Sequence, residues 1–144
     1  MLLKLSAKLS LRLDKFFLSK KHKNNVKIEI ISLLDQACDS LEQILKFEGY
    51  PEKMAIIIED CYIQAKESYR KADSLIRVNM GSKYSQELNV VYRELNFINR
   101  LVSQTKNMNL DPSYIQESTS DWVGGIHDFI NAKDNYVTDY LTKQ

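Results

Sequence analysis

The stretch PEKMAIIIEDCYIQAKESYRKADSLIRVN, residues 51–79, decides the fold of this chain. Apolar or small side chains recur along it at steps of three and four, which places them on one face of a helix. This row consists of Met54, Ile58, Cys61, Ala65, Ser68, Ala72, Leu75 and Asn79. A second row, Ile57, Tyr62, Tyr69 and Ile76, widens the face toward two neighbouring helices. The stretch therefore predicts a long helix that packs against partners on two sides.

A similar pattern precedes this helix and predicts another from about Asn25 to Glu48. Its inward row is Val26, Ile30, Leu33, Ala37, Leu41 and Ile44. Gly49 suits the end of that helix and Pro51 suits the first turn of the next. The first two helices should therefore form a tight antiparallel hairpin.

Two further helices follow the central one. Gly81 should end the central helix, and the next should run from Ser82 to Lys106. Its inward row is Tyr84, Leu88, Val91, Leu95, Ile98, Val102 and Thr105. After a break at 107–110, Asp111 caps a last helix. Its inward residues are Ile115, Trp122, Ile126, Phe129 and Tyr136, with Val123, Ile130, Val137 and Tyr140 beside them.

In the last helix, Gly124 and Gly125 each cost about 1 kcal/mol of helix propensity. Such a pair requires either a close helix approach or a bend. The polar run 131–135 is the expected end of the core-packed part.

Length and composition bound the fold class. A chain of 144 residues suits one domain, and four glycines and two prolines are too few for a sheet protein with many tight turns. No apolar run approaches the roughly 18 residues of a membrane span. The sequence predicts an all-α protein, an antiparallel up-down-up-down four-helix bundle at 24–144 with a basic amphipathic extension at 1–23.

The extension differs in charge from the rest of the chain. It has a net charge of +6, whereas the remaining residues have −5. Its basic residues are Lys4, Lys8, Arg12, Lys15, Lys20, Lys21 and Lys23. Leucines at helical spacing favour a helix here, although Leu9–Asp14 alternates like a strand, and a polar break should follow at 20–25. Such a segment suits a membrane surface, a nucleic acid or a partner groove, or simply packs on the bundle. It also resembles an organelle presequence.

Two cysteines do not make a disulfide framework. The first apolar stretch is interrupted by lysines, so we expect no secretory signal and a cytoplasmic protein. In a hairpin that turns near Gly49, Cys38 and Cys61 lie at the same height. We expect both to be buried, reduced thiols that act as small apolar side chains; a redox link between them is the alternative.

The sequence offers no set of residues for catalysis, metal binding or a cofactor. Neither His22 nor His127 has the Glu three residues earlier that di-iron bundles need. No glycine-rich phosphate loop or nucleophile motif is present. We therefore predict that the protein is not an enzyme and has no small-molecule substrate.

The arginines show a regular spacing that suggests a binding surface. Arg70 and Arg77 are seven residues apart, as are Arg93 and Arg100, and all four lie opposite the apolar rows. With Lys66 and Lys106 they can form one outer surface, because consecutive helices of a bundle are neighbours. Residues 53–106 have a net charge of +3 and the last helix has −4. The surface is therefore a candidate stripe for RNA phosphates, a contact between subunits, or only a solvated face.

Three segments carry a resemblance to a known family: YRELNFINRL at 92–101, NLDPSY at 109–114 and WVGGI at 122–126. Over about 26–130 the chain resembles the bacterial four-helix-bundle family of ribosomal-RNA intervening-sequence proteins and retroelement accessory variability proteins. The resemblance implies a non-enzymatic bundle, a homopentamer, and binding to a reverse transcriptase and its template RNA. The candidate RNA contacts come from their helix faces, not from a family motif.

Together these expectations describe an accessory protein that self-assembles and binds an RNA–protein partner. The alternative is a protein-interaction or membrane-surface module that acts through the basic extension.

Overall fold

In the computed structural model, the backbone is described at residues 2–46, 51–107 and 112–142. Side chains are described at 21–46, 54–105 and 121–142. These parts of the chain are helical and contain no strand. The elements are α1 (Leu2–Lys46), α2 (Pro51–Asn79), α3 (Ser82–Glu87), α4 (Asn89–Asn107), α5 (Pro112–Tyr136) and the π-helix η1 (Val137–Thr142). Because α3 leads into α4 and α5 into η1, the described residues form four long helices, which confirms the predicted all-α class and number of helices.

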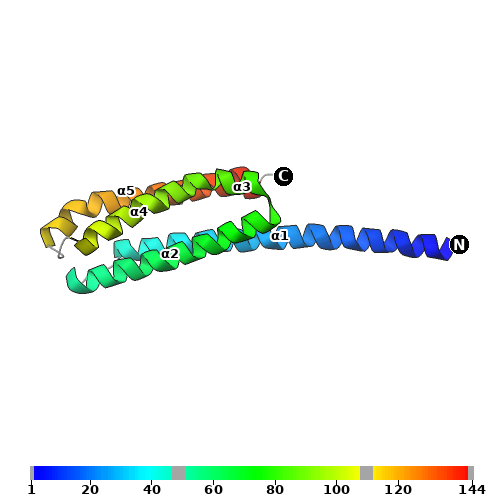
Figure 1. The fold of residues 1–144 in the computed structure, drawn as a ribbon, viewed down its shortest axis with the longest axis horizontal. Helices are drawn as coiled ribbons and strands as arrows, with labels where there is room; N and C mark the ends of the chain where they lie inside the picture. Colours follow the sequence, from blue (N-terminus) through cyan, green and yellow to red (C-terminus); the bar gives the residue numbers. More distant parts are fainter. Residues whose placement is uncertain (1, 47–50, 108–111, 143–144) are drawn as a thin grey trace.

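Each long helix packs against two others (Figure 1). α1 lies along α2 and α4 along α5, and further contacts join α2 to α4 and α1 to α5. The core between them is apolar and receives side chains from all four helices. Its fully buried large residues are Phe129, Ile30, Leu34, Leu41, Ile76, Leu88, Leu95, Ile98, Ile126 and Val91. Burial of these apolar side chains stabilises the packed helices, since isolated helices are marginal in water.

The central helix has the predicted bounds. α2 begins at Pro51 and ends at Asn79, and Gly81 follows with a φ of 94°. The amides of Met80 and Gly81 both donate to the carbonyl of Ile76, at 2.8 and 3.2 Å. A positive φ at this point favours glycine, so the expected stop signal is confirmed.

The buried side of α2 lies between the two predicted rows. Its buried residues are Ile58, Tyr62, Ala65, Tyr69, Ala72 and Ile76. Cys61 and Leu75, from the first row, are only half-buried. The prediction that both cysteines are buried is therefore right for Cys38 and wrong for Cys61, because the core of α2 centres on Tyr62, Ala65 and Tyr69 and leaves Cys61 partly exposed. Both thiols are free, with no link between them.

Two expected breaks differ in the structure. The polar break at 20–25 is wrong, as is the helix start at Asn25, because α1 continues from Leu2 to Lys46. This segment has no glycine or proline, and the exposed side chains of 21–25 can remain in water on a helix. The helix expected at 82–106 is instead interrupted at Leu88, where the amide of Val91 donates to the Leu88 carbonyl at 2.9 Å in a tighter turn.

The core continues to the end of the last helix. Tyr136 is buried, as its place in the inward row predicted, and so is Leu141, so the expectation that the polar run at 131–135 ends the core is wrong. Lys133 lies within this run, and its Nζ is 2.8 Å from Asp35 Oδ1 on α1. Burial by itself would lower the pKa of Lys133, but hydrogen bonds to Asp134 and Asp35 outweigh it and raise that pKa. This cation therefore ties α5 to α1.

Close packing accounts for one of the two adjacent glycines in α5, Gly125. A Cβ at this position would lie 3.0 Å from the Phe97 ring and 3.8 Å from Ile98 on α4, so the close approach is confirmed. A Cβ at Gly124 would meet nothing within 4 Å. Trp122, Ile126 and Phe129 are buried as expected, whereas Val123 is exposed.

Several predicted features lie outside the described residues. These are the links at 47–50 and 108–111 and the side chains of Lys106 and Ile115. The side chains of the extension up to residue 20 also lie outside them, so its amphipathic character stays a prediction. Within the described part of the extension, Lys21, His22 and Lys23 are exposed.

Candidate functional site

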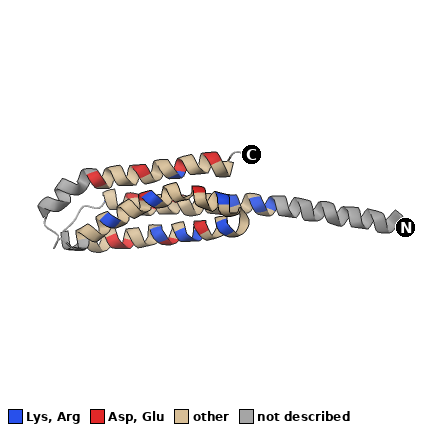
Figure 2. Cartoon of the chain, turned by 45° about the horizontal axis from the view of Figure 1, so that its top comes forward, with Lys and Arg blue, Asp and Glu red and all other residues tan. Residues whose placement is uncertain are grey.

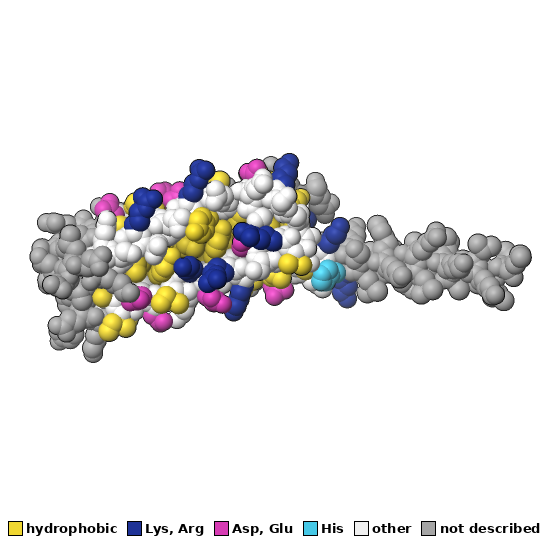
Figure 3. All heavy atoms as spheres, in the orientation of Figure 1, with side chains coloured by type: hydrophobic (Ala, Val, Ile, Leu, Met, Phe, Trp, Pro, Cys, Tyr) yellow, Lys and Arg dark blue, Asp and Glu magenta, His cyan; other side chains and the backbone are white. Residues whose placement is uncertain are grey.

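A groove of about 550 Å³ lies between α2 and α4. Its lining residues are Tyr62, Lys66, Tyr69, Arg70, Asp73, Arg77, Ser85, Asn89, Tyr92, Leu95, Asn96 and Asn99. On the face that carries α2 and α4, Figure 3 shows a band of hydrophobic side chains with Lys and Arg side chains on both sides. We call this feature the α2–α4 groove.

Three cations from α2 line this groove: Lys66, Arg70 and Arg77, here called the basic rim. Helical spacing places them on the side of α2 that faces α4, and all three are exposed. Asp73 is the one carboxylate among the described lining residues. The groove therefore has an excess of positive charge that suits an anionic ligand.

The predicted arginine surface divides at α4. Arg70 and Arg77 line the α2–α4 groove together with Lys66, whereas Arg93 and Arg100 are exposed on α4 without lining it. One helical step separates Arg93 from Tyr92 and Arg100 from Asn99, so the arginines are turned about 100° away from the groove.

Tyrosines lie beneath the rim. Tyr62 and Tyr69 are buried, and Tyr92 lies across from them with 43% of its surface exposed. The ring centroids of Tyr69 and Tyr92 are 5.9 Å apart at a tilt of 34°. Burial raises the pKa of both Tyr62 and Tyr69, with Tyr92 contributing to each, so these phenols stay neutral at physiological pH. They therefore supply an uncharged aromatic surface.

The α4 side of the groove is lined by amides that sequence reasoning missed. Asn89, Asn96 and Asn99 line it with Tyr92, at steps of three and four. We call these three asparagines the amide row. No hydrogen bond joins their side chains to any residue in the part of the chain that the structure describes. The sequence did contain a signal for this wall of the groove, because three asparagines, which are poor helix formers, recur on one face of the helix.

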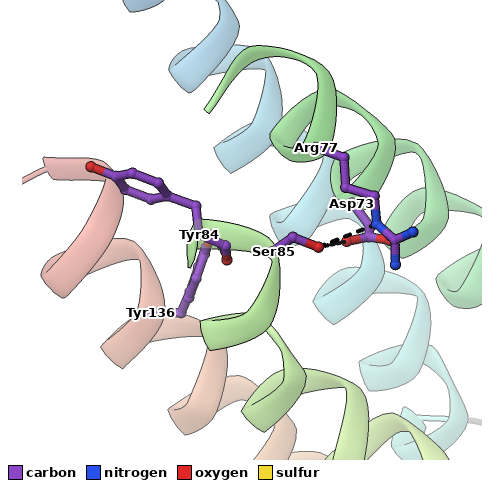
Figure 4. Close-up of polar contacts among 5 residues, drawn as sticks. All are labelled: Asp73, Arg77, Tyr84, Ser85 and Tyr136. Carbon is purple, nitrogen blue, oxygen red and sulfur yellow. Dashed lines mark hydrogen bonds and ion pairs between the residues drawn. The ribbon is translucent and has the colours of Figure 1, made fainter. Parts of the chain in front are cut away.

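A polar network closes the end of the groove near α3 (Figure 4). Arg77 Nε is 3.0 Å from Asp73 Oδ2 and donates to Ser85 Oγ at 3.2 Å. Ser85 Oγ in turn donates to Asp73 Oδ1 at 3.2 Å. Beside it, the Tyr136 hydroxyl donates to the Tyr84 carbonyl at 2.9 Å, so α3 is held between α2 and α5.

A second groove, between α1 and α2, has a different charge. It has a volume of about 700 Å³ and pairs Glu29 and Glu67 with Arg70 and Lys71. With two acids and two bases it has no net charge, so it suits a polyanion less than the α2–α4 groove does.

The outer surface of α5 is acidic. Figure 2 shows acidic positions spaced along this helix and more basic positions on α2. Within 121–142, the described part of α5 and η1, the exposed acids are Asp121, Asp128, Asp134 and Asp139. The molecule therefore presents both a basic and an acidic surface.

Among the described side chains, no group of three or more His, Cys, Asp or Glu that could hold a metal ion occurs, and His127 is exposed on α5. Within the described residues, no helix is both long and apolar enough to cross a membrane.

Comparison with known proteins identifies no relative: no family model matches the chain, and neither a curated protein nor a solved structure is similar to it.

Proposed function

We propose that this chain is a non-enzymatic accessory protein that binds RNA through the α2–α4 groove. The observation that carries the proposal is the basic rim, three exposed cations beside one carboxylate in a groove between two helices. Arginine makes bidentate contacts with phosphate, and phosphate contacts supply most of the affinity in sequence-independent binding.

The helices are proposed to alternate in direction as an up-down-up-down bundle. The short links and the packing of each helix against its chain neighbours support this arrangement. It gives the α2–α4 groove a rigid frame, which favours precise binding.

Self-assembly is the second part of the proposal. The acidic surface of α5 and the basic surface of α2 can meet between two copies, and such a contact forms a ring if its rotation closes. The family resemblance of the sequence supports a homopentamer and a partner composed of a reverse transcriptase and its template RNA. Light scattering that finds a monomer at micromolar concentration would contradict this part.

The test of RNA binding is the salt dependence of affinity. For a single strand, the slope of log K against log salt is about −0.7 per phosphate contact. Arg70→Ala should weaken binding to RNAs of different sequence by a similar factor and reduce this slope by about one contact. Lys83→Ala, an exposed α3 residue outside the groove lining, removes the same charge and is the matched control.

The extension requires its own control. A full-length variant with Gln in place of its seven basic residues should retain RNA binding through the rim. If that variant loses all RNA binding while a Lys66→Ala/Arg70→Ala variant keeps it, the groove is a solvated surface and the extension binds the RNA. Binding to anionic vesicles that is lost in the same variant would support the membrane-surface alternative.

A further inference from the structure

We propose that the α2–α4 groove binds unpaired bases of a single-stranded nucleic acid, with Tyr92 as the stacking surface and the amide row as the base-edge contacts. This inference rests on the proposed function, because it assigns the ligand class of the same groove. The basic rim explains affinity for a phosphate backbone, but it does not explain why the opposite wall carries tyrosine and asparagine.

Tyr92 is placed to stack on a base. It is partly exposed at the groove and is backed by Tyr69, whose ring centroid is 5.9 Å away. Part of the Tyr92 ring stays exposed at the groove after folding, and every nucleobase has a face that stacks on such a ring. Because Tyr69 is buried beneath it, Tyr92 is supported before a ligand arrives.

The amide row supplies donors and acceptors that no other residue in the described part of the chain uses. Asn96 follows Tyr92 by four residues and Asn99 follows it by seven. Tyr92, Asn96 and Asn99 therefore lie along one face of α4. Each amide offers two donor hydrogens and an acceptor oxygen. An asparagine can pair with adenine in a bidentate manner, and single-strand readers contact base edges of this kind.

The charge is on the opposite wall from the amides. Lys66 and Arg70 belong to α2, while Asn96 and Asn99 belong to α4, and both sets line one groove. A strand that lies along it can place phosphates toward the rim and bases toward Tyr92 and the amide row. This division of backbone and base contacts is typical of single-strand recognition.

The dimensions favour a base over a duplex. A volume of about 550 Å³ lies in the range of roughly 300–1,000 Å³ found for small-molecule sites. Such a groove holds unpaired bases but not a double helix, whose Watson–Crick edges are already paired and whose width exceeds the groove. The rival ligand is an acidic peptide, which the rim accommodates but which has no use for a stacking surface.

The experiment compares two oligonucleotides of equal length and charge with the full-length chain. One is a short oligoadenylate, and the other has the same backbone without bases. Wild type should bind the oligoadenylate about tenfold more tightly. A difference in affinity of this size is what the stacking of one base on an aromatic ring contributes. Tyr92→Ala should bind the two oligonucleotides with nearly equal affinity, because it removes the stacking surface. The double variant Asn96→Ala/Asn99→Ala should retain only part of the preference for bases, because it removes the base-edge contacts. Tyr92→Phe should retain the preference for bases.

Two controls separate this inference from the proposed function. Arg70→Ala should weaken binding of both oligonucleotides by the same factor, because it removes a backbone contact. Asn131→Ala, an exposed asparagine on α5, should change neither affinity. Circular dichroism of each variant confirms that it is folded.

Each remaining outcome overturns the inference in an identifiable way. If wild type binds both oligonucleotides equally and Arg70→Ala weakens both, the inference fails and RNA binding stands. If neither oligonucleotide binds, the proposed function fails as well. If an acidic peptide binds instead, and Tyr92→Ala and the double asparagine variant weaken it, the groove recognises a protein.

Discussion

Helix α4 makes two very different contacts with its neighbours. Toward α5 it packs closely, with Phe97 and Ile98 against Gly125, where even one added carbon would lie 3.0 Å from a ring. Toward α2 it leaves a groove lined by Tyr92 and the amide row. One helix therefore stabilises the fold on one side, and on the other it presents amides that form no hydrogen bond with the described residues.

The groove side of α4 contributes less to the stability of the helix than the side packed on α5. Asparagine is a poor residue for a helix interior, and three of them on one face lower helix propensity without a compensating hydrogen bond within the described residues. Local choices that oppose the fold are expected at functional sites. The α4–α5 contact shows no such conflict, apart from a glycine whose cost is offset by close packing.

The largest expected effect tests the contrast between the two sides of α4 at two adjacent residues. Ile98→Ala should lower the free energy of unfolding by about 2–5 kcal/mol, because Ile98 is fully buried and its loss leaves a cavity. Asn99→Ala should leave stability unchanged or raise it by up to about 0.7 kcal/mol, since Asn99 is exposed and alanine is the better helix former. Urea denaturation of both variants measures the contrast, and similar losses would show that the two sides of α4 do not differ.

The glycine pair sharpens the comparison at the α4–α5 contact. Gly125→Leu should destabilise the protein by about 1–3 kcal/mol, because its side chain meets the Phe97 ring. Gly124→Ala is the matched control and should stabilise the protein by about 0.5–1 kcal/mol, because its Cβ meets nothing and alanine favours the helix. Thermal unfolding that shows no difference in sign would rule out close packing at Gly125.

The cysteines extend the contrast between enclosed and open positions to α1 and α2. Burial is the main cause that raises the pKa of Cys38 from 9.0 to about 12, against the opposing charge of Lys133, and burial also raises the pKa of Cys61. At pH 8 we expect Cys61, which is half-buried, to react with a thiol reagent about tenfold faster than Cys38. This ratio corresponds to a difference of about 1.4 kcal/mol in the activation free energy of labelling. Labelling of Cys38→Ala and Cys61→Ala variants separates the two rates.

The same thiol predicts a pH dependence of stability. The pKa of Cys38 is higher in the folded state, so the unfolded thiol ionises first as the pH rises. Its contribution to stability is therefore complete below pH 9 and is lost between about 9 and 12. The Cys38→Ala variant should show a smaller alkaline loss than wild type; an equal loss would place its cause in other groups.

The smallest effect concerns charge in the α2–α4 groove. Asp73→Asn removes the one carboxylate among the described lining residues and releases Arg77 from its ion pair. We expect roughly threefold tighter RNA binding at low salt, with the gain reduced at high salt. Asp128→Asn, an exposed acid on α5, is the control for net charge. Equal gains in the two variants would indicate a long-range effect and not a groove contact.

Sequence reasoning succeeded where signals are local. Pro51 and Gly81 mark the bounds of α2, and inward rows at three-four spacing identified most of the core. It failed at 20–25, where lysines and asparagines suggested a break, because exposed polar residues are equally compatible with a continuous helix. It found Lys66, Arg70 and Arg77, but it also grouped them with Arg93 and Arg100, which do not line the groove.

By itself, then, the sequence determined the helical class, the extent of α2 and the identity of most buried residues. These depend on spacing along one helix, which a 3.6-residue period makes visible. Only the tertiary structure decided that Tyr92 and the amide row face the basic rim, that Cys61 is only half-buried, and that the Phe97 ring packs against Gly125. Those positions depend on how far each helix is rotated and displaced against its neighbours. That rotation is the joint outcome of packing on several faces and has no signature in any single segment.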